Sequence, residues 1–256
     1  MDESDARYPS LAGRVVFVTG GASGIGGGIV AHFCAQDARV SFIDIQREDA
    51  ERLIAGIASR GHRPPRFFPA DLKEIPALQA AIAGAARLDG PIRVLVNNAA
   101  NDDRHQVEKV TEAYWQDRMD VNLRHQFFAA QAVRPQMREA GGGSIINFGS
   151  ISWMNSERDC IAYVTAKAAV GGLTRGLARE LGPERIRVNC VVPGWVMTDR
   201  QLALWVTEEG EHEMDRNQCL PGRLVPADVA RMVLWLAADD SRMCTAQNFI
   251  VDAGWT

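Results

Sequence analysis

Tyr163 and Lys167 are the residues whose types and spacing first suggest catalysis. They lie four residues apart in a stretch of helical character, 161–181, so both side chains project from one face about one turn apart. An ammonium beside a phenol favours the phenolate, and we expect Lys167 to lower the pKa of Tyr163 from its usual value of about 10. Tyr163 is therefore predicted to exchange a proton with a substrate as a general base. The spacing by itself also fits an amphipathic helix with a lysine that reaches the solvent.

Ser150 stands where a third catalytic group is expected. It ends a predicted strand, 13 residues before Tyr163. In an open α/β sheet, ligands bind at the carboxyl ends of the strands, so the Ser150 hydroxyl could hold the reacting oxygen. Ser152, two residues further into the loop, is a rival, and we prefer Ser150.

A glycine-rich loop, TGGASGIG at 19–26, separates the first predicted strand from the first predicted helix. Glycine permits positive φ and lets a pyrophosphate approach the backbone amides, while the helix N-terminus contributes partial positive charge. We expect Gly20, Gly24 and Gly26 to hold a dinucleotide in this way, with Ser23 and Ile25 as further contacts. A tight turn without a ligand would use the same glycines, so the loop needs supporting context.

Asp44 supplies that context, because it ends the second predicted strand 18 residues after Gly26. A carboxylate there can accept hydrogen bonds from the adenosine ribose hydroxyls and would repel a 2′-phosphate, which favours NAD over NADP. Arg47 could tolerate the phosphate, so the preference is not absolute. Asp71 ends the third strand and is predicted to bond the adenine amino group, with helix capping as an equal alternative. Leu72 beside it is a further predicted cofactor contact.

The rest of the chain must form the elements that bring these groups to one edge of a sheet. Short apolar runs alternate with stretches of helical period, as repeated βαβ units do, and most runs are continuously apolar, as strands buried on both faces must be. This pattern predicts an α/β fold, one Rossmann-type domain over 1–256 whose seven-stranded parallel sheet carries helices on both faces. The predicted strands are 14–20, 39–45, 66–71, 92–99, 144–150, 187–194 and 249–254.

Helix boundaries carry the usual signals. Asp71 and Thr111 stand where N-caps are expected, Gly61 and Gly90 follow the first helical windows, and Pro226 falls at a helix start. The segment at about 198–226 breaks the alternation of strands and helices. Because it is polar and Glu-rich, we expect it to be an insertion of short helices that lies over the substrate.

Composition narrows the possible functions. The chain has 256 residues, a net charge of -4 and no basic cluster, which argues against nucleic acid as a partner. No apolar run approaches the ~18 residues that span a membrane, and the acidic first ten residues contain no apolar core of a signal peptide, so a cytoplasmic protein is expected. Five cysteines never form a Cys-x-x-Cys pair, and we expect them to be reduced and without a metal.

The motifs together stand in the order that is typical of the short-chain dehydrogenase/reductase family, which the chain resembles over essentially its whole length. They are TGGASGIG, NNAA at 97–100, Asn122, Ser150, Tyr163-x-x-x-Lys167 and Pro193-Gly194. The resemblance implies that Tyr163 takes the hydroxyl proton, Ser150 positions the substrate and Lys167 also binds the nicotinamide ribose. It further implies that Asn122 holds a water that relays the proton. The further cofactor contacts that the resemblance implies are Asn98, Ala99, Pro193, Gly194, Val196 and Thr198. Ala100 departs from the family, which usually has glycine there.

The loops expected to wall the substrate pocket follow the fourth, fifth and sixth predicted strands. A sugar needs directed hydrogen bonds and flat apolar faces for its C–H surfaces, whereas an acyl chain or a steroid needs a long apolar slot. These loops are polar with indoles among them, and they favour a sugar. The predicted substrate contacts are Asn101, Ser152, Trp153, Asn155 and Trp195. The charges at 102–104 would equally well cap loops or pair with one another.

Within the family, the segments VLVNNAANDDRH, INFGSISW and DAGW resemble the bacterial D-xylose 1-dehydrogenases and related aldose dehydrogenases. That resemblance implies NAD-dependent oxidation of an aldose, such as D-xylose or L-arabinose, at C1 to the aldonolactone. The alternatives are a family member that acts on a sugar acid or a carbonyl substrate, such as a 3-oxoacyl reductase, and a dinucleotide-binding protein without catalysis. The tryptophan-tipped segment 249–256 resembles tails that pack at a tetramer interface, so a homotetramer is expected.

Overall fold

All seven predicted strands pair in one parallel sheet in the computed structural model, which describes residues 6–256. The strand order is β3-β2-β1-β4-β5-β6-β7, so the chain crosses after β3 to the other side of β1 and continues outward with β4. This confirms the predicted α/β fold class, and the neighbours β1 and β4 mark the switch point at which such sheets bind ligands. The strands are β1 (Val15–Thr19), β2 (Arg39–Asp44), β3 (Arg66–Pro69), β4 (Val94–Asn97), β5 (Gly143–Phe148), β6 (Ile186–Pro193) and β7 (Asn248–Val251).

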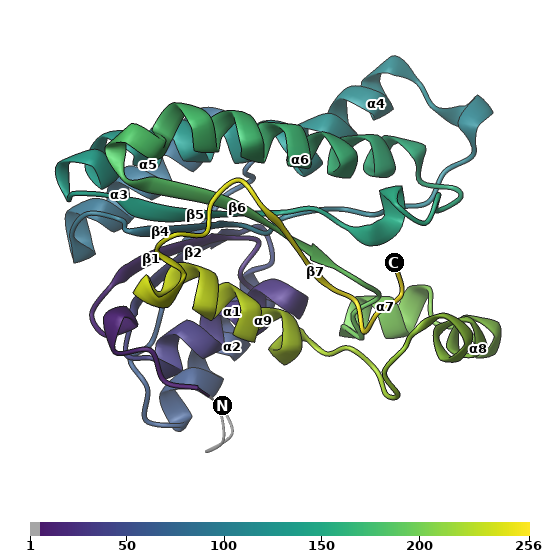
Figure 1. The fold of residues 1–256 in the computed structure, drawn as a ribbon, viewed down its shortest axis with the longest axis horizontal. Coiled ribbons are helices and arrows are strands. Elements are labelled where there is room, and N and C mark those ends of the chain that lie inside the picture. The colour runs from purple at the N-terminus through teal and green to yellow at the C-terminus, as the bar shows by residue number, and fades with distance from the viewer. Residues whose placement is uncertain (1–5) are drawn as a thin grey trace.

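Helices cover both faces of the sheet, as predicted. Figure 1 shows α3, α5 and α6 above the sheet and α1, α2 and α9 below it. The helices are α1 (Gly24–Ala35), α2 (Arg47–Ser59), α3 (Ile75–Asp89), α4 (Glu112–Met119), α5 (His125–Glu139), α6 (Ile161–Leu181), α7 (Asp199–Leu204), α8 (Glu208–Asn217) and α9 (Pro226–Ala237). Between residues 6 and 256, no helix combines the length and the apolar character needed to cross a membrane.

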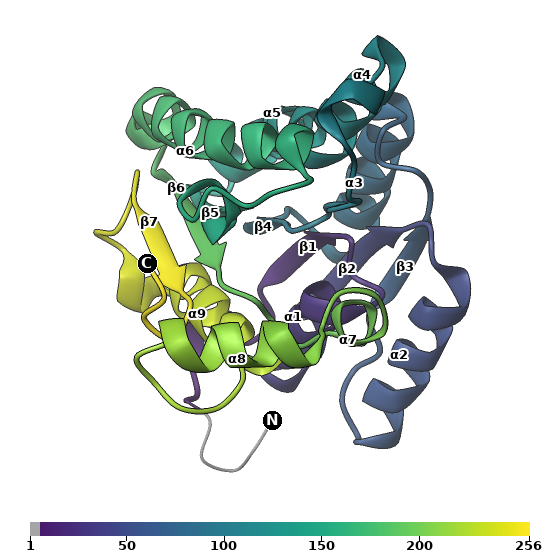
Figure 2. The ribbon, with the colours of Figure 1, turned by 90° about the vertical axis from the view of Figure 1, so that its right-hand side faces the viewer.

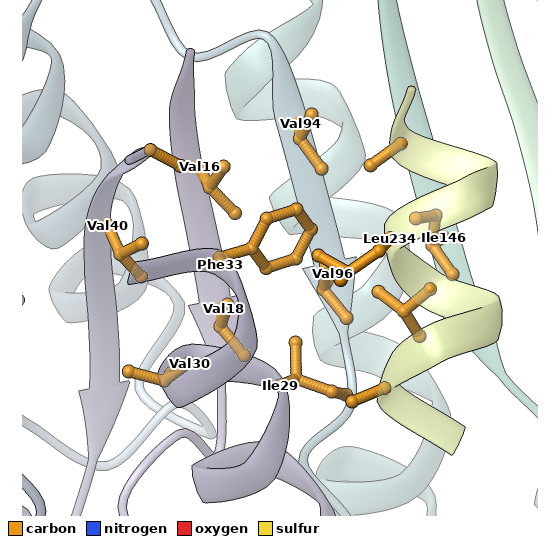
Figure 3. Close-up of a cluster of buried hydrophobic side chains, with 14 of the residues drawn as sticks. Val16, Val18, Ile29, Val30, Phe33, Val40, Val94, Val96, Ile146 and Leu234 are labelled. Carbon is orange, nitrogen blue, oxygen red and sulfur yellow. The ribbon is translucent and has the colours of Figure 1, made fainter. Parts of the chain in front are cut away.

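Two hydrophobic layers hold the helices onto the sheet. Every residue of β1 is buried, and its alternate side chains enter different layers: Val16 and Val18 pack below with α1 and α9, whereas Phe17 packs above with α3 and α5. In Figure 3, the ring of Phe33 from α1 lies among the strand valines, with Leu234 of α9 nearby. The outer strands β3 and β7 are only partly buried, since each has a neighbour on one side.

Most of the predicted helix signals are confirmed. Thr111 Oγ1 accepts a hydrogen bond of 3.1 Å from the Tyr114 amide, Gly90 ends α3 with φ 97°, and Pro226 is the first residue of α9. The prediction of Asp71 as a helix cap is wrong. Helix α3 begins at Ile75, and Asp71 Oδ1 instead accepts a hydrogen bond of 2.9 Å from the Lys73 amide within the turn before it.

The predicted insertion between β6 and α9 forms two short helices, α7 and α8. Each helix is preceded by a threonine that caps it. The Thr198 side chain accepts a hydrogen bond from the Gln201 amide, and the Thr207 side chain accepts one from the Gly210 amide. The side of the molecule that faces the viewer in Figure 2 shows α7 and α8 lying across the end of the sheet. They are therefore placed over the carboxyl edge, where a ligand would bind.

The loop between β1 and α1 needs its glycines for two different reasons. Gly20 and Gly24 have φ values of 66° and 54°, a region that other residues rarely adopt. Gly26 lies in α1, where a Cβ would overlap the carbonyl oxygen of Gly20. Helix α1 can therefore approach the loop this closely only without a side chain at position 26.

We expect Gly26→Ala to lower the free energy of unfolding by about 3 kcal/mol or more, because the methyl group forces the helix away from the loop. Gly27→Ala is the matched control. Its Cβ would lie 3.4 Å from the nearest atom, an ordinary contact, and alanine favours the helix by up to about 1 kcal/mol. Urea denaturation of both variants measures the difference. Equal stabilities would show that the loop does not require a glycine at 26.

Candidate active site

A cavity of about 250 Å³ opens at the carboxyl edge of the sheet, and most of the predicted site residues meet there. The loops after β4, β5 and β6 contribute to its wall together with α6, α7 and α8. The predicted residues that line it are Ile25, Asn98, Ser150, Ser152, Asn155, Tyr163, Lys167, Pro193, Gly194, Trp195, Val196 and Thr198. Ile25 and Thr198, which are 173 positions apart in the chain, thus line the same cavity.

Helix α6 carries Tyr163 and Lys167 on one face, as their spacing predicted. The Lys167 ammonium lies 5.6 Å from the centre of the Tyr163 ring and donates a hydrogen bond of 2.9 Å to the carbonyl of Phe148, the last residue of β5. Lys167 is only 2% exposed. The alternative of a lysine that reaches the solvent is therefore wrong.

The expected direction of the Tyr163 pKa shift is wrong for the protein without ligands. Burial raises the pKa of Tyr163, and the charge of Asp102 raises it further, whereas a hydrogen bond with Ser150 lowers it. Burial also lowers the pKa of Lys167 to about 8. The reason for the difference is that both groups are buried in one site, where desolvation favours the neutral form of each.

Ser150 lies at the start of the short turn Ile151–Trp153 that follows β5. Its hydroxyl bonds with Tyr163 and accepts a hydrogen bond of 3.2 Å from the Ser152 amide. Ser152, its rival, also lines the cavity but has no hydrogen-bond partner for its buried hydroxyl among the described residues. The bond with Tyr163 favours Ser150 as the group that acts together with the phenol.

Asn122 is fully buried in a π-helical turn, Asp120–Arg124, between α4 and α5. Its side chain binds the backbone of Asn101 twice: Oδ1 accepts from the Asn101 amide at 2.9 Å, and Nδ2 donates to the Asn101 carbonyl at 3.0 Å. Nδ2 also donates to the Arg118 carbonyl at 2.9 Å. Asn122 therefore anchors the start of the loop after β4.

His125 is a buried neighbour of this site that sequence analysis did not identify. It is the first residue of α5 and is fully buried. Burial and the positive charge of Lys167 lower its pKa to about 3, so the imidazole stays neutral. A neutral ring beside Lys167 adds no second charge to the interior. One histidine in a helical stretch carries no periodic signal that would have identified it.

The loop between β1 and α1 is built to receive a dinucleotide. The Ser23 side chain makes no capping hydrogen bond at the start of α1, which leaves the first amides of the helix for a ligand. Asn98 Nδ2 donates to the carbonyls of Thr19 and Gly20 at 3.1 and 2.9 Å and holds the loop against β4. Any side chain at Gly26 would fill the space between this loop and the start of α1, which we call the cradle. The residues present therefore fit a pyrophosphate.

Asp44 lies beside this cradle at the end of β2. Its carboxylate accepts hydrogen bonds from the amides of Ala22 and Gln46 at 2.9 and 3.0 Å, so it is tied to the glycine loop itself. The next residue, Ile45, is 71% exposed and brings no positive charge. The carboxylate is thus held against the glycine loop, and Asp71 and the buried Leu72 lie after the neighbouring strand β3.

Two predicted substrate contacts are not brought to the cavity. Asn101 is held by Asn122 through its backbone, and the exposed Trp153 is not among the cavity-lining residues. Eleven further residues line the cavity although they were not selected as site residues, and the polar or aromatic side chains that matter most among them are Asp102, Arg104, Glu157, Gln201, Glu213 and Trp255. Within residues 6–256, no group of three or more histidine, cysteine and acidic side chains could hold a metal.

Comparisons with known proteins agree with this geometry. A family profile described as enoyl-(acyl carrier protein) reductase matches residues 20–256. D-xylose 1-dehydrogenase of Caulobacter vibrioides is 52% identical over 98% of this chain and 99% of its own, and a probable galactose dehydrogenase of Rhizobium meliloti is 47% identical over 97% of each. A solved structure of a blue fluorescent protein from a metagenomic library, in complex with NADPH, superposes with a TM-score of 0.88 and 34% identity over 96% of this chain and 99% of its own.

The lowered pKa of Lys167 predicts a pH-dependent effect of Lys167→Met. Lysine titrates at 10.5 in the unfolded chain and at about 8 in the folded protein. Between these two pH values the unfolded chain binds more protons than the folded protein, so the free energy of unfolding of the parent increases as the pH rises. With methionine at position 167 this increase is absent. Relative to the parent, the variant should therefore be more stable at about pH 7 than at about pH 10, by about 2 kcal/mol.

Urea denaturation at the two pH values measures this difference. The control is Lys109→Met, which removes an exposed ammonium from the short helical turn Val107–Lys109 and should show the same relative stability at both. The same relative stability of Lys167→Met at both pH values would mean that the folded protein and the unfolded chain bind this proton equally well, so that burial does not lower the pKa of Lys167.

Proposed function

Because the chain belongs to the short-chain dehydrogenase/reductase family, and is therefore an oxidoreductase that acts on CH–OH groups, we propose that it oxidises an aldose at C1 to the aldonolactone with NAD. The observation that carries the proposal is the polar cavity around Tyr163, which has a volume of about 250 Å³ and is lined by Trp195, Trp255 and several hydrogen-bonding side chains. Such a wall suits a small polyol. The sugar dehydrogenases among its relatives support the same substrate class.

Tyr163 is proposed to be the catalytic base. The proton of the anomeric hydroxyl passes to the phenolate oxygen of Tyr163 while Ser150, already bonded to the phenol, holds the reacting oxygen. Lys167, whose pKa of about 8 lies near the working range, favours the phenolate when it is protonated and holds the nicotinamide ribose. A bound oxidised nicotinamide supplies the hydride acceptor. Asn122 is proposed to keep the water that carries the proton outward.

Residues around the cradle are proposed to bind the dinucleotide. Gly20, Gly24 and Gly26 admit the pyrophosphate, and Asp44 accepts hydrogen bonds from the adenosine ribose. The preference for NAD rests on the repulsion between Asp44 and a 2′-phosphate. NADPH in the solved relative shows only that a protein of this fold can bind that cofactor. The other proposed contacts are Ser23, Ile25, Asp71, Leu72, Asn98, Ala99, Pro193, Gly194, Val196 and Thr198.

The competing reactions place different demands on the cavity. A sugar acid needs a cation free to pair with it, yet Arg104 already pairs with Glu157 at 3.0 Å and Lys167 bonds the Phe148 carbonyl. A long acyl chain needs a continuous apolar slot, whereas this wall places the carboxylates of Asp102, Glu157 and Glu213 among its apolar side chains. A protein without catalysis has no need for the Ser150–Tyr163–Lys167 arrangement.

We also propose that the protein is cytoplasmic and forms a homotetramer. The proposal of a tetramer rests on the resemblance of the segment 249–256 to tails at tetramer interfaces.

The proposed reaction predicts NADH formation at 340 nm when purified protein is given NAD and one of D-xylose, L-arabinose, D-galactose, D-glucose or L-fucose. Tyr163→Phe removes the base and should reduce kcat by at least about a hundredfold. Tyr8→Phe, a substitution of the same kind near the amino terminus, should retain the parent rate. No turnover on any of these aldoses with NAD or NADP would refute the substrate class, and parent activity in Tyr163→Phe would refute the mechanism.

The cofactor preference is tested through Asp44. We expect the parent to have a kcat/KM at least about tenfold higher with NAD than with NADP, because the buried carboxylate repels the 2′-phosphate. Asp44→Asn removes the charge with little change in shape and should narrow this ratio. Asp37→Asn, an exposed position before β2, is the control that should leave the ratio as it is. A parent enzyme that uses both cofactors equally would contradict the role of Asp44.

A further inference from the structure

Asp102 enters the wall of the active-site cavity from the loop after β4. Its Oδ2 accepts a hydrogen bond of 2.7 Å from Gln201 Nε2, and Gln201 Oε1 in turn accepts one of 2.9 Å from Trp195 Nε1. Gln201 belongs to α7, and Trp195 follows β6. The stretch that contains Trp195 and Gln201 therefore holds a carboxylate from a loop 99 positions before Gln201 at the cavity wall.

This carboxylate keeps capacity to accept further hydrogen bonds. Its other oxygen, Oδ1, accepts a hydrogen bond of 3.4 Å from Arg200 Nε, and the side chain is 21% exposed. An ionised carboxylate has about four lone-pair positions, and the bonds from Gln201 and Arg200 use two of them. Asp102 is also close enough to the reacting group that its charge raises the pKa of Tyr163.

The ionisable groups that line the cavity are mainly acidic. Asp102, Glu157 and Glu213 are the acids, and Arg104 and Lys167 are the bases. Both bases already have other partners, since Arg104 donates to Glu157 at 3.0 Å and Lys167 to the Phe148 carbonyl at 2.9 Å. A neutral molecule with several hydroxyls can donate to these acids, whereas a second anion would meet like charge.

We propose that Asp102 determines the substrate class of this enzyme, accepting hydrogen bonds from the hydroxyls of a neutral sugar and repelling a sugar that carries a carboxylate. The inference rests on the proposed aldose oxidation and extends it to the choice between neutral and acidic sugars. A hydroxyl that donates to a carboxylate forms a stronger bond than one that donates to a neutral oxygen. The bond from Gln201, whose own side chain is held by Trp195, fixes the carboxylate before the sugar arrives, which reduces the entropy lost on binding.

The test compares sugars that differ only in the charge at C6. D-glucose and D-glucuronate form one pair, with CH₂OH in the first and a carboxylate in the second, and D-galactose and D-galacturonate form the other. We would measure kcat and KM with NAD for the parent, Asp102→Asn and Asp103→Asn, and measure any sugar that is not turned over as a competitive inhibitor. Asp103 is the matched control, because it lies on the same loop, pairs with Arg118 and Arg200, and is not among the cavity-lining residues.

We expect Asp102→Asn to raise the KM for the neutral sugars roughly tenfold, with a smaller change in kcat. The preference for the neutral member of each pair should fall by a similar factor, and Asp103→Asn should keep the parent values. If the parent oxidises aldoses but Asp102→Asn keeps the same KM and the same preference, the role of Asp102 is overturned and the proposed function stands. A parent that prefers the uronates also overturns it. A parent that oxidises no aldose overturns the proposed function itself, and the recognition role with it.

Discussion

The active site depends on one hydrogen bond, from the Lys167 ammonium to the Phe148 carbonyl. It joins α6 to the end of β5, and it partly offsets the cost of burying an ammonium that is 2% exposed. The same burial has opposite effects on the two partners of the pair, since it lowers the pKa of Lys167 and raises that of Tyr163. Both groups are thereby held closer to their neutral forms than they would be in water. The chain on its own keeps the phenol protonated, and a positive charge brought into this site is what would favour the phenolate.

The fold separates the groups that do chemistry from the groups that recognise a substrate. Ser150 belongs to the turn after β5, and Tyr163 and Lys167 belong to α6, which the Lys167 bond ties to the end of β5. The opposite wall is formed by the loop after β4 and by α7 and α8, which meet one another through side chains such as Gln201 and Asp102. Changes in that wall leave Ser150, Tyr163 and Lys167 on their own elements, and among its residues Asp102 acts on the phenol through its charge. Relatives that share about half of their residues with this chain can therefore differ in substrate while the reaction stays the same.

Sequence reasoning succeeded where one short segment determines the structure. The glycine loop, the four-residue spacing of Tyr163 and Lys167 and the apolar strand runs each depend on local geometry, and the sheet with its helices followed from them. It failed where the outcome depends on contacts between distant segments. Gln201 and Asp102 are 99 positions apart, and nothing in either segment indicates that they meet. The pKa of Tyr163 was mispredicted for the same reason, because the spacing to Lys167 is visible in the sequence whereas the burial of both groups and the nearby charge of Asp102 are not.

Asn122 links the two halves of the site. The π-helical turn points its side-chain amide at the backbone of Asn101, and the amide uses its acceptor and both of its donor hydrogens on the carbonyls and the amide of Asn101 and Arg118. A relay water would therefore have to donate to an oxygen of Asn122, either Oδ1 or the main-chain carbonyl; each accepts one hydrogen bond, from the Asn101 amide and from Gln126 at 3.1 Å, and has a second lone pair. The residue after Asn101 is Asp102. The proposed proton exit and the proposed sugar-binding carboxylate are thus fixed to the same helical turn, so a shift of that turn would disturb both the protonation of Tyr163 and the recognition of the substrate.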